Sequence, residues 1–268
     1  MSTFISILKD HWEWRKQIVK LAKSDIIKTY SGAALGWSWA IIKPLITVTV
    51  YWFAFSIGLR MSSAINGYPY VLWLIAGIVP WFYISEMITQ GTECIRKYRF
   101  LVTKMKFPVS TIPTFIAMSK MVVHLILLVI VMLIFICTGH RPDIYWLQIP
   151  IYMFLMFICA VCWALFSAML AAISVDFLNL VKSIVTAIFW MSGIMWDVNS
   201  IHIGWLQTVL QFNPVTFLAT GYRNCFIYKV WIWEQPLSFL YFLIVLILLG
   251  IGAVWAYKKL YKEIPDVL

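Results

Sequence analysis

The chain has 268 residues, of which 63% are hydrophobic and only 12% are charged, and its formal net charge is +10. Soluble domains are about 45–50% apolar and about 25% charged. This composition therefore excludes a water-soluble fold and predicts one integral membrane domain over residues 1–268, with no separate soluble domain.

The positive charge is distributed as in a membrane protein. Most Lys and Arg residues lie in the N-terminal 36 residues, in the segment 96–106 and in the tail at Lys258, Lys259 and Lys262. Cytoplasmic loops of membrane proteins are enriched in these residues, and anionic lipids of the inner leaflet attract them. The basic clusters contain none of the motifs that recognise nucleic acid. We therefore predict membrane lipid, and not nucleic acid, as a partner of these clusters.

Residues 4–22 are predicted to form an amphipathic helix that lies in the membrane interface. Its apolar side carries Phe4, Leu8 and Trp12, and its basic side carries Lys16 and Lys20. A helix with one apolar and one basic face partitions into the headgroup region of a bilayer. The alternative is an ordinary helix that packs against the rest of the domain.

Six hydrophobic stretches are each near the roughly 20 residues that a membrane-spanning helix needs. They lie at about 37–59, 70–92, 114–137, 149–174, 181–196 and 236–257. The fifth is short, and the following residues 197–235 contain two apolar halves that are interrupted at Asn213-Pro214. Neither half can cross alone, so we predict a re-entrant helical hairpin on the outer side before the last span.

Counting Lys and Arg residues sets the orientation. With six spans, the segments on the side of the termini hold fifteen Lys and Arg residues and the opposite loops hold four. Because the richer side is cytoplasmic, both termini are predicted to be in the cytoplasm.

The segment 96–108 is the most informative part of the chain. It carries five cations between two nearly uncharged spans, and Phe100, Leu101, Val102, Met105 and Phe107 alternate with them. A solvated loop has no need of this much apolar surface. We therefore predict a short cytoplasmic helix that docks onto another protein.

Few residues are available for chemistry inside the membrane. Lys43, Lys120, Glu86 and Glu93 lie near the cytoplasmic ends of their spans, where lysines can extend to the interface; a Lys43 ion pair with either glutamate is the alternative. His124 is interpreted as a packed histidine. The chain has no GxxxxGK[ST] loop, metal cluster or catalytic motif. We predict a protein that is not an enzyme, has no cofactor or metal, and takes its energy from another chain.

Several motifs, in order along nearly the whole chain, resemble those of ABC-2 type permeases that export polysaccharides. They are Lys28–Pro44 at the entry to the first span, Ala76–Trp81 in the second, Leu101–Pro108 with Pro113, Asp176 with Phe189–Trp196, and Asn213-Pro214 followed by Tyr222-Arg223. Each motif alone is weak, but the set is specific. One departure is Val175-Asp176, where family members often carry Arg-Asp, so a role of that arginine does not carry over.

The resemblance implies a homodimeric channel in the bacterial plasma membrane, bound to two copies of an ABC ATPase that holds ATP and Mg. The implied substrate is a polymer linked to undecaprenyl diphosphate. Within the family the chain looks most like the wall teichoic acid permeases, and the O-antigen and capsular polysaccharide permeases have the same motifs. A small-molecule or drug exporter of the same superfamily is a further alternative, and a membrane-embedded enzyme or an ion channel is a remote one.

The resemblance also suggests roles for particular residues. Contacts to the ATPase are expected from a coupling helix in segment 96–108, at Arg99, Phe100, Leu101, Lys104, Met105, Lys106, Phe107 and Pro108. Candidates for binding the lipid headgroup or lining the conduit are Lys43, Arg60, Trp73, Trp81 and Glu86. Candidates for an outer gate are Asn213, Pro214, Tyr222 and Arg223.

Overall fold

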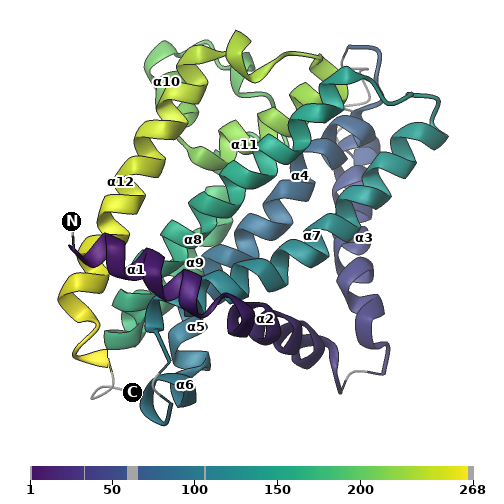
Figure 1. Ribbon diagram of the computed structural model, residues 1–268. Helices are drawn as coiled ribbons and strands as arrows, with labels where there is room; N and C mark the ends of the chain where they lie inside the picture. The colour runs from purple at the N-terminus through teal and green to yellow at the C-terminus, as the bar shows by residue number, and fades with distance from the viewer. Residues whose placement is uncertain (1, 33, 59–65, 106, 265–268) are drawn as a thin grey trace.

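The computed structural model describes residues 2–32, 34–58, 66–105 and 107–264, which fold into a bundle of α-helices (Figure 1). The all-α prediction is confirmed for this part of the chain. The α-helices are α1 (Ser2–Glu13), α2 (Arg15–Tyr30), α3 (Trp39–Trp52), α4 (Tyr70–Glu86), α5 (Thr92–Lys97), α6 (Arg99–Thr103), α7 (Ile112–Cys137), α8 (Ile149–Ile173), α9 (Val175–Met191), α10 (Gly204–Gln211), α11 (Pro214–Arg223) and α12 (Pro236–Leu260).

Short 3₁₀ or π-helical turns extend several of these helices. They lie at Gly36–Ser38, Phe53–Gly58, Met87–Gly91, Val109–Thr111, Ile144–Gln148, Val198–Ser200, Asn224–Tyr228 and Ile232–Glu234. With these turns included, the described residues form five helical stretches that are long and apolar enough to cross a membrane. The five are Gly36–Gly58, Tyr70–Lys97, Val109–Cys137, Ile144–Ile173 and Pro236–Leu260. Each coincides with one of the predicted spans.

The helix at the remaining predicted span, 181–196, begins and ends earlier in the chain than predicted, at Val175 and Met191. This helix, α9, begins at Val175 because the Ser174 side chain caps it by accepting a hydrogen bond from the Phe177 amide at 3.2 Å. Side-chain oxygens of this kind satisfy amides that have no partner within the helix. The chain then turns at Gly193, whose φ is +60°. With 17 residues, α9 is at the lower limit of length for a membrane span.

The predicted helix 4–22 is also wrong in one respect, because it is two helices, α1 and α2, that meet at Trp14. The Trp14 ring packs edge-on against Phe107, with ring centroids 5.1 Å apart. Phe4, Leu8 and Trp12 on α1 are exposed, whereas Ile18 and Ala22 on α2 are buried in the bundle. The apolar residues of 4–22 therefore face two different environments instead of forming one stripe.

Helix α4 is at the centre of the bundle and packs against α7 and α11, while α8 packs against α5 and α12. The Tyr70–Lys97 stretch is mostly buried, whereas the apolar surfaces of Gly36–Gly58 and Pro236–Leu260 are mostly exposed. Exposed apolar helices of this length are stabilised by lipid rather than by water. The bundle thus has a packed centre and a lipid-compatible exterior.

The two ends of the bundle are built differently. Helices α1, α2 and α6 and the C-terminal end of α12 lie in the lower half of Figure 1, and α10 lies at the top. Between α10 and α11 the helix is interrupted at the expected Asn213-Pro214 pair. The Asn213 side chain accepts a hydrogen bond from the Val215 amide at 3.0 Å, and Pro214 occupies the first turn of α11. Both are favoured residues at a helix start.

Candidate functional site

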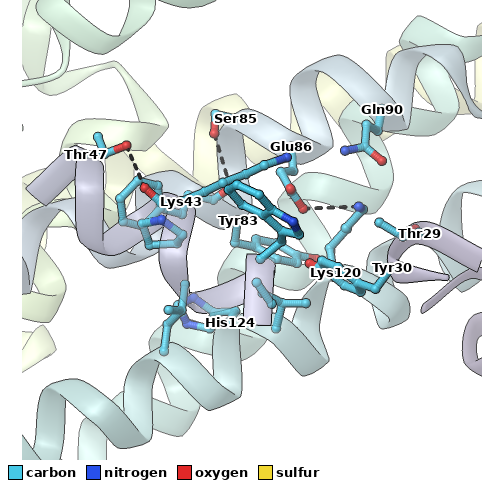
Figure 2. Close-up of a pocket in the computed structure, with 16 residues that line it drawn as sticks. Thr29, Tyr30, Lys43, Thr47, Tyr83, Ser85, Glu86, Gln90, Lys120 and His124 are labelled. Carbon is cyan, nitrogen blue, oxygen red and sulfur yellow. Dashed lines mark hydrogen bonds and ion pairs between the residues drawn. The ribbon is translucent and has the colours of Figure 1, made fainter. Parts of the chain in front are cut away.

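A polar pocket of about 460 Å³ lies between α3 on one side and α4 and α7 on the other, with the C-terminal turn of α2 at its edge (Figure 2). It is lined by Thr29, Tyr30, Trp39, Ala40, Lys43, Pro44, Thr47, Phe82, Tyr83, Ser85, Glu86, Gln90, Lys120, Val123, His124 and Leu127. Hydroxyl, amide and ammonium groups converge here within an otherwise apolar bundle. Convergent polar groups in a preformed concavity mark a ligand-binding site.

The charged groups of the pocket come from three helices. Lys120 Nζ on α7 lies 3.2 Å from Glu86 Oε2 on α4, and the exposed fractions of their side chains are 2% and 39%. Lys43 on α3 lines the same pocket and is exposed. In the Lys120–Glu86 pair the lysine is thus the buried partner, and the Glu86 carboxylate reaches the open side of the pocket. With two ammonium groups and one carboxylate, the pocket has a net positive charge.

The alternative of a Lys43 ion pair with Glu86 or Glu93 is not found among the described residues. Glu86 pairs with Lys120, and Glu93 pairs with Lys182 on α9 at 2.8 Å. The sequence placed both glutamates correctly near one end of the second span. It could not show which helix lies beside them, because helical periodicity gives the face of a residue but not its neighbour.

The second span has a π-helical turn, Met87–Gly91, directly after Glu86. Such a turn widens the helix locally and is frequent at functional sites. Gln90 within the turn lines the pocket. On the other side of the turn, Gly91 lies so close to α8 that an added Cβ would be 2.9 Å from Ala164 Cβ. A side chain at position 91 would therefore push this turn away from α8.

His124 connects the pocket with α11. Its Nε2 lies 2.6 Å from the Tyr222 hydroxyl, and both residues are buried. The interpretation of His124 as a packed histidine is therefore confirmed. The interaction itself could not be predicted, because the two residues are 98 positions apart. Tyr222, a predicted outer-gate residue, is buried in this arrangement and contacts the wall of the pocket through His124.

At the edge of the pocket, the Tyr30 hydroxyl remains protonated over the whole physiological range. Burial raises the pKa of Tyr30 to about 12, and the nearby carboxylates of Glu86 and Asp25 add to this effect. A protonated phenol is a hydrogen-bond donor. Tyr30 therefore adds a neutral donor to the two ammonium groups.

The residues of segment 96–108 divide into an exposed and a buried set. Arg99, Phe100, Lys104 and Met105 are exposed on α6 and the turn after it, and Lys106 lies outside the described residues. Leu101 and Phe107 are buried, and Pro108 is half-buried. Leu101 and Phe107 therefore hold the segment against this chain and offer no surface to a partner. The exposed set is the part that is available for docking.

Of the other predicted headgroup or conduit residues, Trp73 and Trp81 are both buried on α4. The Trp73 indole donates a hydrogen bond to the Tyr228 hydroxyl at 2.7 Å, and the Trp81 ring packs near Phe189 at 5.4 Å. Neither lines the polar pocket. Arg60 lies outside the described residues.

Arg223, predicted at an outer gate, is buried, and each of its three guanidinium nitrogens donates a hydrogen bond. It donates hydrogen bonds to the backbone carbonyls of Trp73, Gly193 and Ile194. It therefore joins α11 to α4 and to the turn after α9, and offers no free charge in this conformation. Asn213 also makes an inter-helix contact, because its amide donates to Ser192 Oγ at 2.8 Å.

The bundle of long apolar helices and the pocket between them define a polytopic α-helical membrane protein. The chain belongs to the ABC-2 type transporter family, whose model matches residues 16–227. This match covers α2 to α11, including the charged pocket and α6.

Three curated relatives extend the similarity over most of the chain. The O-antigen export system permease protein RfbA of Myxococcus xanthus is 23% identical over 226 residues, which cover 83% of this chain and 84% of the relative. A protein of the same name from Klebsiella pneumoniae is 24% identical over 254 residues, 94% of each chain. Another from Klebsiella pneumoniae is 22% identical over 251 residues, 92% of this chain and 94% of the relative.

Proposed function

We propose that this chain is the membrane subunit of an ABC exporter for an O-antigen-type polysaccharide. The observation that carries the proposal is the family membership, together with similarity over nearly the full length to O-antigen export permeases. The motifs alone favoured wall teichoic acid, but the relatives with this coverage are O-antigen permeases. We therefore prefer the O-antigen-type substrate over teichoic acid.

In this proposal α9 is also a span, the fifth of six in chain order, and both termini are in the cytoplasm. Helices α10 and α11 form the re-entrant hairpin at the outer side of a bacterial plasma membrane. The positions of α1, α6 and the C-terminal end of α12 in one half of the bundle support this orientation (Figure 1). The exposed apolar residues Phe4, Leu8 and Trp12 of α1 suit the membrane interface. Lys16 and Lys20 on α2 are exposed and suit lipid phosphates.

Energy would come from two copies of an ABC ATPase bound to a homodimer of this chain. Helix α6 and the turn after it are the proposed docking element. There Arg99, Phe100, Lys104 and Met105 form an exposed mixed surface, and the buried Leu101 and Phe107 anchor the segment. An exposed aromatic ring beside cations is typical of an anchor residue at a protein interface.

The pocket between α3, α4 and α7 is the proposed site for the diphosphate of an undecaprenyl-diphosphate-linked polymer. Lys43, Lys120 and the neutral donor Tyr30 suit a diphosphate, since ammonium groups and phosphate oxygens form charge-assisted hydrogen bonds. The outward surface of α3 exposes Leu45, Ile46 and Val50. A polyprenyl tail could therefore remain in lipid while its headgroup enters the pocket.

The decisive experiment is reconstitution in nanodiscs together with an ABC ATPase from the same organism. We expect the two chains to copurify and O-polysaccharide on polyprenyl diphosphate to stimulate ATP hydrolysis more than lipid-linked teichoic acid does. Stimulation by teichoic acid alone would overturn the substrate assignment. Stimulation by small amphiphilic drugs alone would favour a drug exporter, and failure to bind any ABC ATPase would contradict the whole proposal.

A further inference from the structure

The carboxylate of Asp25 on α2 is buried at the base of the 96–108 segment. Its Oδ1 accepts hydrogen bonds from Lys97 Nζ at 2.9 Å and from the Tyr98 hydroxyl at 2.5 Å. Its Oδ2 accepts one from Ser119 Oγ at 2.6 Å. Burying an ionised carboxylate costs several kcal/mol unless it is paired and hydrogen-bonded. Three donors from two other helical segments offset that cost, so Asp25 holds these segments in one arrangement.

Two of the three donors, Lys97 and Tyr98, lie where α5 meets α6. Tyr98 lies at the break between α5 and α6, where the backbone leaves helical geometry (φ −108°, ψ 28°). Lys97 is the last residue of α5. A displacement of α6 relative to the second span must therefore bend the chain at the two residues that hold Asp25.

Asp25 also reaches both sides of the charged pocket. Thr29, one helical turn further along α2, lines the pocket and donates a hydrogen bond from its hydroxyl to the Asp25 carbonyl at 2.8 Å. Ser119 directly precedes Lys120, the buried cation of the pocket. Asp25 thus connects the α6 junction with the α7 wall of the pocket through its carboxylate and with the α2 wall through its backbone carbonyl.

A second hollow of about 350 Å³ adjoins the same junction. It is lined by Lys28, Thr29, Gln90, Lys97, Tyr98 and Phe100. Thr29 and Gln90 line both this hollow and the charged pocket. The two concavities therefore share walls, and Phe100 of α6 borders the second one.

We propose that Asp25 is a positioning residue that makes α6, the end of α2 and the Lys120 turn of α7 move together, so that displacement of α6 reshapes the charged pocket. The inference rests on the proposed function for the source of that displacement, which is the ATPase. Asp25 does not touch the substrate in this arrangement. It transmits the position of α6 to groups that do.

The test compares Asp25→Asn and Lys97→Met with Lys97→Arg, which keeps a cationic donor, and with Glu93→Gln. Glu93 is the matched control, because its ion pair with Lys182 involves the same helix α5 and is exposed at both partners. The first measurement is amide hydrogen exchange of the permease alone in nanodiscs. We expect Asp25→Asn to raise exchange both in residues 26–30 and in residues 98–103, whereas Glu93→Gln raises neither.

The second measurement is ATP hydrolysis by the complex with and without lipid-linked polysaccharide. Basal hydrolysis should stay within twofold of wild type, while polymer stimulation should fall about tenfold for Asp25→Asn and Lys97→Met, within the usual range of coupling energies. Lys97→Arg, which keeps a cationic donor, should retain polymer stimulation close to that of wild type. Full stimulation in both variants, or exchange that rises in only one of the two regions, would overturn the inference. If polymer does not stimulate ATP hydrolysis by the wild-type complex, that result counts against the proposed function. The role of Asp25 is still tested in that case, because the exchange measurement uses the permease without an ATPase.

Discussion

The guanidinium carbon of Arg223 lies 3.4 Å from the centre of the Trp73 ring, and three backbone carbonyls accept its hydrogen bonds. This stacking is possible because residue 77, one turn further along α4, is glycine. A Cβ at Gly77 would lie 2.3 Å from Arg223 Nη2. Close approach through glycine is a common device for packing helices in membranes, and here it makes room for a buried cation.

We therefore predict that Gly77→Ala destabilises the permease. Overpacking of this kind costs about 1–3 kcal/mol. Gly250→Ala in α12 is the control, because an added Cβ there meets nothing within 4 Å, and alanine favours a helix over glycine by about 1 kcal/mol. Thermal unfolding in detergent, followed by tryptophan fluorescence, should show a lower Tm for Gly77→Ala and an unchanged or higher Tm for Gly250→Ala. Equal shifts would contradict the account.

Hydropathy located the long helices well. A segment inside lipid must satisfy its backbone hydrogen bonds internally, so a long apolar stretch of this kind forms a helix. Hydropathy failed where a single contact sets the boundary. Trp14 ends α1 through packing on Phe107, which is distant in sequence, and Ser174 starts α9 within a stretch that includes the polar Asp176. Such boundaries depend on tertiary contacts and caps, which leave little trace in a hydropathy average.

For the site, the sequence found Lys43 and Glu86 but missed Asp25. A signal was present, because Asp25 is the only acidic residue between positions 14 and 85. It also lies on the same helical face as Ile18 and Ala22, which are buried. A lone carboxylate on the buried face of a lysine-rich helix needs a donor from elsewhere. Its partners Lys97 and Ser119 could be identified only in three dimensions.

Because Glu86 and Lys120 form an ion pair, we predict that the effects of substituting them on stability are not additive. Glu86→Gln leaves a buried ammonium without its counter-charge, and losing a hydrogen bond to a charged group costs about 1.5–3 kcal/mol. The double variant Glu86→Gln/Lys120→Met removes the buried charge as well and should recover much of that loss. Lys182→Met, in the exposed pair with Glu93, should cost less than about 1 kcal/mol. A double variant less stable than Glu86→Gln in thermal unfolding would refute this reading.

The same pocket predicts opposite effects of two substitutions on anion binding. Farnesyl diphosphate is a suitable soluble probe, with farnesol as the uncharged control. Lys43→Gln removes a cation and should weaken binding about tenfold, which corresponds to about 1.4 kcal/mol. Glu86→Gln removes a competing carboxylate and should strengthen binding. Titration of the purified permease by thermophoresis measures both, and changes of the same sign would place the diphosphate elsewhere.

Asp25 predicts a defined dependence of stability on pH. Burial alone would raise the pKa of Asp25, but hydrogen bonds from Ser119, Tyr98 and Lys97 hold it below its ordinary value of 3.8. A lowered pKa stabilises the fold above the ordinary value, and this contribution is lost as the pH falls through the lowered one. The stability difference between wild type and Asp25→Asn should stay constant from about pH 8 to 5 and shrink below about pH 4. A difference that grows on acidification would contradict the assignment.

Phe100 and Leu101 are adjacent in α6 but predict different defects. Phe100 is exposed, so Phe100→Asp should leave the Tm of the permease nearly unchanged and reduce copurification of the ATPase. Leu101 is buried, so Leu101→Asp should lower the Tm by placing a carboxylate in an apolar contact, with loss of partner binding as a consequence. Leu147→Asp, at an exposed position before α8 at the opposite end of the bundle, controls for the added charge.

If the complex with Phe100→Asp purifies intact, α6 does not dock through its exposed surface. If Leu101→Asp keeps the wild-type Tm but loses the ATPase, the buried residue takes part in docking directly and α6 must turn outward in the complex.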